Sequence, residues 1–288
     1  MATIITKDKL AKVADVEFTK KFNENASKLI EMLGQTESIV MQPGTLLKCY
    51  QTVGQLTNPD SYTEGQDIPL SEFGTKLLWS KEITMKPYRK TTTAQAIQAR
   101  GYDQAVEETD KKMVSAIQKT IKAELAAALA TATTAADQFV PTTTTGANFK
   151  AAAANAYGAL AAKMEDYGDP EPVYFVNPVD FAAYVGSNDV VSTWGMQYVE
   201  NFAGLGSMIA TTAVASGTIY CTDKQNINVY SINPAGIDGF TFYTDETGLV
   251  GVQHETTYRN LSLDTVAVTG FTIFPEIASL VVKSTISA

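Results

Sequence analysis

The chain has 288 residues, with a hydrophobic fraction of 45% and a charged fraction of 18%, which is ample material for one elaborate or two modest domains. It carries 22 basic and 31 acidic residues, a formal net charge of −9. This balance excludes a dedicated nucleic-acid binder, because such proteins displace counterions from phosphates with a basic surface. A protein of this charge that lies near DNA encloses or repels it. The low charge density fits both a surface covered by neighbours and a sequence that is simply rich in Thr and Ala.

The number of cysteines and the length of the apolar stretches indicate the cellular compartment in which the protein folds. Cys49 and Cys221 are far apart and have no other cysteine near them, so neither a disulfide framework nor a zinc site is predicted. We therefore expect a reducing cytoplasm. The first residues lack the apolar run of a signal peptide, and no stretch approaches the ~20 apolar residues of a membrane span, so no membrane partner is expected.

The first third of the chain predicts helix and then an extended arm. Lys7–Leu33 has the apolar spacing of one or two amphipathic helices and ends at Gly34. Thr45–Val53 and Lys76–Met85 read as two strands, and the segment between them is full of turn signals. Leu46–Arg89 is thus a hairpin with little core of its own. It is either a long surface hairpin or an arm that becomes ordered against neighbouring subunits.

Three basic residues follow at the root of the returning strand: Lys86, Arg89 and Lys90. They form either a solvated basic patch or ion pairs with carboxylates of a neighbouring copy. Exposed pairs of this kind contribute only ~0–1 kcal/mol each.

One long helix is predicted over Gly101–Thr131, which at 1.5 Å per residue spans on the order of 45 Å. Its charged residues lie mainly off the apolar stripe, and Glu107–Lys111 and Glu108–Lys112 are pairs in the favourable order. The stripe consists of Val106, Thr109, Met113, Val114, Ile117, Ile121, Leu125, Ala128 and Leu129.

The remainder mixes helices and strands without a regular βαβ order, which indicates the α+β class. Thr131–Gly146 reads as a connection and Phe149–Tyr167 as a second helix, and Asn177 is the expected N-cap of a short helix. The expected strands are Pro172–Val176, Met208–Thr212, Thr218–Cys221, Ile227–Ile232, Tyr258–Phe274 and Ile277–Ser284.

Signatures of catalysis are missing. The one histidine, His254, has no nucleophile motif nearby, so we expect a structural role for it. Gly204-Leu205-Gly206 fails the dinucleotide fingerprint, because Ile209 occupies the third glycine position. There is no Walker A sequence and no calcium loop. We predict a non-enzyme with no cofactor and no metal.

The order of elements resembles the HK97-type major capsid protein of tailed bacteriophages. Tyr62–Pro69 resembles the tip of that family's E-loop, Gly101–Thr131 its spine helix, and Val173–Pro178 the strand and helix of its A-domain. Gly204–Met208 with Gly217–Tyr220 resembles a later strand pair of the A-domain, and Val266–Phe274, Pro275-Glu276 and Leu280–Lys283 resemble the return to the P-domain and the final strand.

The resemblance implies an α+β, HK97-like capsid fold with an N-arm, an extended E-loop hairpin, a P-domain with a long spine helix, and an A-domain. The implied divisions are an N-terminal arm and helix at 1–44, the E-loop at 45–90, the P-domain with its spine helix at 91–140, the A-domain at 141–250, the P-domain return strands at 251–274, and the final strand and C-terminus at 275–288.

The implied function is a major capsid protein that self-assembles into hexamers and pentamers of an icosahedral shell around phage double-stranded DNA. The DNA is not bound sequence-specifically, and the location is the virion, assembled in the host cytoplasm. Only about 40 residues precede the expected E-loop strand, so a separate scaffold protein is expected, together with a portal. The candidate inter-subunit contacts are Glu64, Gly65, Asp67, Ile68, Pro69, Lys76, Lys81, Lys86, Arg89 and Lys90.

Some relatives form lysine–asparagine cross-links between subunits. Lys76 and Lys81 lie in the arm and Asn260 near the return strand, but no Glu lies between Asn260 and Phe274 to act as the base, so no cross-link is expected. Two alternatives to the capsid remain open. One is an encapsulin-like bacterial compartment, which has this fold but carries enzyme cargo. The other is an unrelated enzyme, which the missing motifs disfavour.

Overall fold

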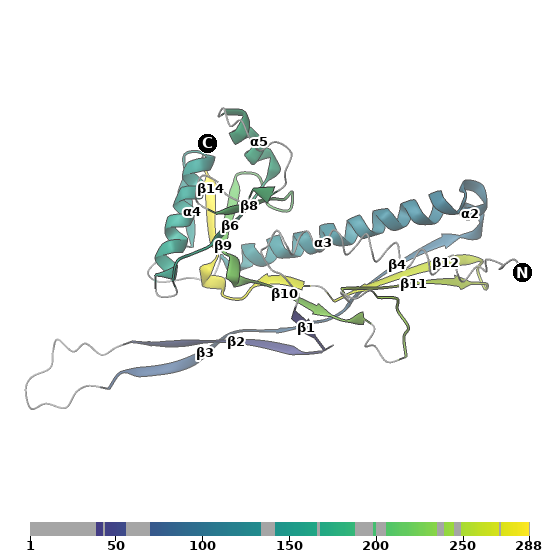
Figure 1. Ribbon diagram of the computed structural model, residues 1–288, viewed down its shortest axis with the longest axis horizontal. Helices are drawn as coiled ribbons and strands as arrows, with labels where there is room; N and C mark the ends of the chain where they lie inside the picture. The colour runs from purple at the N-terminus through teal and green to yellow at the C-terminus, as the bar shows by residue number, and fades with distance from the viewer. Residues whose placement is uncertain are drawn as a thin grey trace, which may run out of the picture.

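In the computed structural model, the two-stranded hairpin extends away from the rest of the chain and the long helix lies along a separate sheet (Figure 1). The structure describes residues 39–42, 44–55, 70–133, 142–165, 168–187, 198–199, 206–234, 239–244, 249–270 and 272–287. The predicted helices at 7–33 lie outside these ranges.

The hairpin consists of β2 (Leu46–Gln55) and β3 (Glu72–Glu82), paired antiparallel. Their register shifts between Cys49 and Tyr50, which marks a bulge in the ladder. Both predicted strands are confirmed. The hairpin meets the body at Ile83, which is 1% exposed and packs with Tyr230, Ile232 and Phe274.

The basic cluster lies outside this hairpin, unlike the prediction that placed it at the root of the returning strand. The chain leaves the hairpin at Ile83 and forms a new strand, β4 (Lys86–Thr93). This strand pairs with β12 (Ser262–Thr269), which pairs in turn with β11 (Val250–Thr257). Because extended residues continue from β3 into β4, the sequence pattern shows no boundary between the two sheets. The boundary lies at Ile83, whose side chain is buried in the core.

The long helix begins with an irregular turn. Helix α2 (Ala94–Arg100) ends at Gly101, whose φ of 83° suits glycine. A π-helical turn, η2 (Asp103–Glu107), then leads into α3 (Glu108–Ala132). The single helix predicted from Gly101 is therefore confirmed in its length, with an added α2 and a π-helical start. The predicted stripe is buried at Val106, Val114, Ile117, Ile121, Leu125 and Leu129.

A six-stranded sheet forms the region around the C-terminal strand, in the order β5-β14-β9-β6-β8-β7. Helix α4 (Phe149–Met164) packs its Ala-rich face against this sheet, and α5 (Pro178–Ser187) lies beside it. Asn177 accepts from the Val179 backbone N–H at 2.9 Å, as its predicted N-cap role requires. The strands are β5 (Thr143–Gly146), β6 (Pro172–Val176), β7 (Tyr198–Val199), β8 (Ser207–Ala210), β9 (Thr218–Asp223) and β14 (Val282–Ile286).

A further three-stranded sheet joins the hairpin base to α3. It has the order β1-β10-β13, formed by Ile39–Met41, Ile227–Ile232 and Thr272–Pro275. Residues of β10 and β13 pack under α3 in the largest hydrophobic cluster. Short 3₁₀ turns, η3 (Lys224–Asn226) and η5 (Ala278–Leu280), lie near this region.

Two predicted strands are divided in the structure. The stretch predicted at Tyr258–Phe274 consists of a turn, β12 and β13, and the stretch at Ile277–Ser284 begins with η5. Leu261 in the turn has φ 50°, and its carbonyl accepts from the Ala94 backbone N–H at 2.7 Å. This contact with the start of α2 holds the turn in place, and residue periodicity does not reveal it. No described helix is long and apolar enough to cross a membrane.

Candidate self-association surface

The two faces of the hairpin have different surroundings. One face packs on the body of the chain, where Leu47 joins the cluster around Ile83 and the Lys81 ammonium lies 4.2 Å from the centroid of the Phe274 ring. Leu47 and Lys81 are cross-strand partners, so their side chains share this face. Burial, and the charge of Lys86, lower the pKa of Lys81. Near the base of the hairpin, this face therefore contacts the chain itself.

The opposite face presents apolar side chains to solvent. Tyr50 is 59% exposed and its cross-strand partner Leu77 is 45% exposed. Leu46 and Phe73 share this face by their register and are exposed too. A two-stranded ribbon is only marginally stable by itself, and a run of exposed apolar groups on a monomer is typical of an interaction surface. We call Leu46, Tyr50, Phe73 and Leu77 the outer hairpin face.

The predicted contact residues at the tip, Glu64, Gly65, Asp67, Ile68 and Pro69, lie outside the described residues. Lys76 belongs to β3, opposite Gln51, and its side chain is also not described. Their contacts with other copies stay a prediction. Sequence reasoning missed the outer hairpin face, although alternating exposed apolar residues in both predicted strands were a signal for it.

The three basic residues of β4 have partners within the same chain. Lys86 pairs with Glu124 of α3. Arg89 Nη2 lies 2.6 Å from Asp264 Oδ2 of β12, with the Arg89 side chain 65% exposed. Lys90 Nζ lies 2.5 Å from Asp110 Oδ1 of α3. Carboxylates of the same chain therefore pair with all three residues within the subunit, and their contacts with a neighbouring copy stay a prediction.

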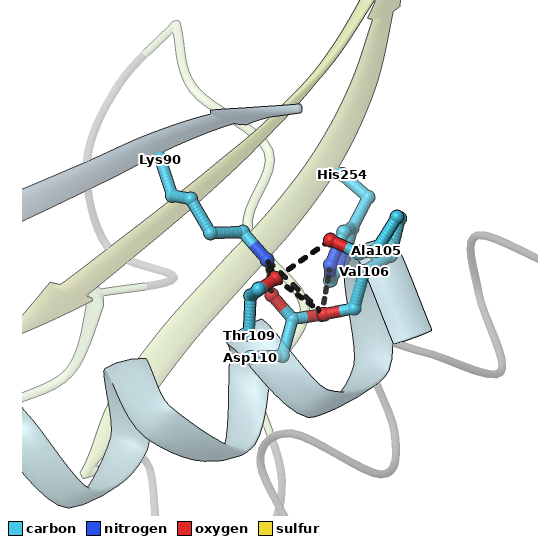
Figure 2. A network of polar contacts seen from close by, with 6 residues as sticks. All are labelled: Lys90, Ala105, Val106, Thr109, Asp110 and His254. Carbon is cyan, nitrogen blue, oxygen red and sulfur yellow. Dashed lines mark hydrogen bonds and ion pairs between the residues drawn. The ribbon is translucent and has the colours of Figure 1, made fainter. Parts of the chain in front are cut away.

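A buried polar network fastens α3 to the sheet (Figure 2). His254 of β11, Thr265 of β12 and Lys90 of β4 are successive cross-strand partners, so they form one row facing α3. Asp110 bridges the two outer strands of this row. Its Oδ1 contacts Lys90 at 2.5 Å and its Oδ2 contacts His254 Nε2 at 3.0 Å.

The first turns of the helix complete the network. Lys90 also donates to Thr109 Oγ1 at 2.6 Å and to the Val106 carbonyl at 3.1 Å. The π-helical turn lies just before Asp110. The Thr109 hydroxyl makes contacts of 2.8 and 2.9 Å with the carbonyls of Ala105 and Val106. The side chain of His254 is 0% exposed, so it holds the structural position predicted for it.

Electrostatics favour a charged Asp110. Burial by itself opposes the carboxylate, but the hydrogen bonds from His254 and Lys90 outweigh burial and lower the pKa of Asp110 below its ordinary value of 3.8. Sequence reasoning overlooked Asp110. It lies four residues from both Val106 and Val114, on the apolar stripe, and a carboxylate at such a position requires partners.

Among the described residues, no group of three or more His, Cys, Asp or Glu side chains could hold a metal ion.

The sequence matches no protein-family model and no curated protein. Similarity to solved structures is extensive. The capsid of cyanophage P-SCSP1u aligns with a TM-score of 0.57 over 87% of this chain and 86% of that chain, at 10% identity. The chain has the HK97-like fold of phage capsid proteins.

Two further capsids support that fold. The capsid of the native GTA particle aligns with a TM-score of 0.56 at 10% identity, over 87% of this chain and 88% of that chain. The mature capsid of bacteriophage PhiM1 aligns with a TM-score of 0.52 at 10% identity, over 87% and 85% of the two chains. The predicted capsid fold is thus confirmed as a mixed helix and strand architecture over most of the chain. At this identity the likeness concerns the fold.

Proposed function

We propose that this chain is a major capsid protein that self-assembles into an icosahedral shell around phage double-stranded DNA. The observation that carries the proposal is the alignment of most of the chain with phage capsid chains. The outer hairpin face adds a physical reason, since a monomer leaves this apolar surface uncovered. The role is structural, with no catalytic step and no cofactor.

The sub-domains of the capsid fold are assigned to this chain as part of the proposal. The β2–β3 hairpin is the E-loop, and it ends at Glu82 rather than at residue 90, because β4 belongs to another sheet. Helix α3 is the spine of a P-domain that includes β4, β11 and β12. The six-stranded sheet with α4 and α5 is the A-domain.

Assembly proceeds by repeated weak contacts between copies. Each hairpin lies over an adjacent subunit and buries the outer hairpin face there. Each subunit in a closed, symmetric shell is held by several neighbours at once, so modest contacts add up to a stable particle. Hexamers and pentamers form the shell, with a separate scaffold protein and a portal during assembly in the host cytoplasm. The final location is the virion.

Deleting residues 58–73 tests the role of the hairpin. The deletion removes the tip and Phe73 and leaves the core clusters intact. We expect shells to disappear in sedimentation and negative-stain microscopy while the helical circular-dichroism signal is retained. Shells that form normally without the segment would contradict the proposed mechanism, as would loss of the whole fold.

The contents of purified particles distinguish a capsid from an encapsulin-like compartment. Particles produced with the phage's other head proteins should contain nuclease-protected double-stranded DNA. Particles that instead hold one co-purifying enzyme and no DNA would show that the compartment is the correct function.

A further inference from the structure

The solvent side of α3 carries an unusual concentration of positive charge for an acidic chain. Lys111, Lys112 and Lys119 are exposed and Lys122 is half-buried. At 100° per residue, the four lysines fall within an arc of about 100°, away from the buried Val114, Ile117 and Ile121. We call these four residues the lysine stripe.

The lysine stripe has no ion-pair partner among the described residues. The pairs of Glu107 with Lys111 and Glu108 with Lys112, which the sequence favours, are not formed within ion-pair distance there. The π-helical turn ends at Glu107 and changes the spacing of that pair. Glu108 is an exposed acidic residue on the same arc, and it leaves the stripe with a net positive charge. The ammonium groups are thus available to an external anion.

Helix α3 and the sheet β11-β12-β4 form one layer, and the side of this layer opposite α3 has a different charge. Strand neighbours point to opposite faces, so Arg89, Asp264 and Glu255 lie on the side of the sheet away from α3, next to the inward row of Lys90, Thr265 and His254. Arg89 is neutralised by Asp264, and Glu255 is exposed. One side of the layer therefore favours a polyanion and the other side does not.

We propose that the lysine stripe contacts phosphates of the packaged double-stranded DNA, so that the α3 side of this layer faces the interior of the shell. The inference rests on the proposed function. The stripe extends over about 16 Å of helix axis, along which a DNA duplex presents about ten phosphates. Flexible lysines act as point charges and read no bases, so the contact is independent of sequence. The net charge of −9 keeps the contact local and weak.

Binding of a 30-base-pair duplex to the full-length chain tests the contact, with fluorescence anisotropy at several salt concentrations. The variant K112Q/K119Q/K122Q is compared with the wild type and with K150Q/K224Q/K283Q. The control has the same change of charge in the region of the six-stranded sheet. We expect the slope of log affinity against log salt to fall by about 2.7 in the stripe variant, about 0.9 for each lost phosphate contact. The control should keep the wild-type slope.

The inference would be overturned if the wild type and the stripe variant had equal slopes of log affinity against log salt. It would also be overturned if the control variant lost as much of this slope as the stripe variant. Formaldehyde cross-linking of DNA-filled particles adds a second readout, with peptide mass spectrometry after nuclease digestion. Nucleotide adducts should concentrate on the lysine stripe, and filled particles without adducts there would also overturn it. Shell formation is measured on the same variants by sedimentation. Failure of the wild type to form any shell would contradict the proposed function, whereas normal shells with unchanged DNA binding would contradict only the stripe.

Discussion

Asp110 occupies a position on α3 that an apolar residue would ordinarily take, and it is retained there by two partners from different strands. Lys90 and His254 approach its two oxygens from β4 and β11. Removal of one member of a buried ion pair leaves the other charge without compensation, which costs more than the pair contributes. The network therefore fixes the position of α3 on the sheet at the level of single atoms.

Replacing Asp110 with Asn should destabilise the fold by about 3 kcal/mol, because the half-buried Lys90 ammonium loses its buried counter-charge. Urea unfolding of unassembled subunits measures the change. Glu108→Gln is the matched control on the same helix, and its exposed side chain should change the free energy of unfolding by less than about 0.5 kcal/mol. A D110N variant as stable as E108Q would show that the network contributes little.

Acid should remove the contribution of Asp110. Its pKa in the folded state lies below the ordinary value of 3.8, so its stabilisation is present above about pH 4 and is lost as the pH falls through the folded pKa. The difference in unfolding free energy between the wild type and D110N should thus stay constant from about pH 6 to about pH 4 and shrink from there to about pH 3. A difference that stays constant below about pH 4 as well would exclude Asp110 as the titrating group.

Among the elements, the hairpin shows most clearly what local pattern does and does not reveal. Both strands follow from their Leu, Tyr, Val and Thr content. The end of the hairpin cannot be predicted from composition, because extended residues continue into β4 and only the burial of Ile83 separates the two sheets. The length of the long helix follows from its stripe. The π-helical turn and the role of Asp110 depend on β4 and β11, which are distant in sequence.

Polar substitutions on the outer hairpin face should separate assembly from folding. In Y50S/L77S both side chains are already exposed, so subunit stability should change little, while sedimentation should show a clear loss of assembled material. Leu47→Ser on the body face is the control, and it should lower the free energy of unfolding by about 2 kcal/mol. Normal assembly of Y50S/L77S would mean that this face is not an interface.

Two glycines around α4 should respond oppositely to alanine. A Cβ at Gly146 would lie 2.2 Å from the Ala152 backbone nitrogen, so G146A forces β5 and α4 apart and should cost about 1–3 kcal/mol. A Cβ at Gly158, within α4, meets nothing within 4 Å, and G158A should stabilise the subunit by about 0.5–1 kcal/mol. Thermal unfolding of both variants checks the pair, and equal effects would contradict this packing of α4 on the sheet.

At the scale of the whole molecule, a body with a long helix packed on a sheet carries a hairpin that extends away from it (Figure 1). The outer hairpin face lacks cover from the described chain, which is the surface that the proposed assembly would bury. The order of elements in the sequence was sufficient to indicate the capsid fold, because a long arm followed by a long helix is unusual. The pairing of β4 with β12 was not predictable, since the partners Thr93 and Ser262 are 169 positions apart in the sequence and local patterns carry no long-range register.

The central claim is that this chain closes into shells, and imaging the expressed protein tests it most directly. Negative-stain microscopy with analytical sedimentation should show hollow, roughly spherical particles of uniform size, formed alone or with a scaffold protein. Particles and free subunits should exchange with concentration as mass action requires. A compact species that stays monomeric at every concentration, with and without scaffold, would contradict the claim.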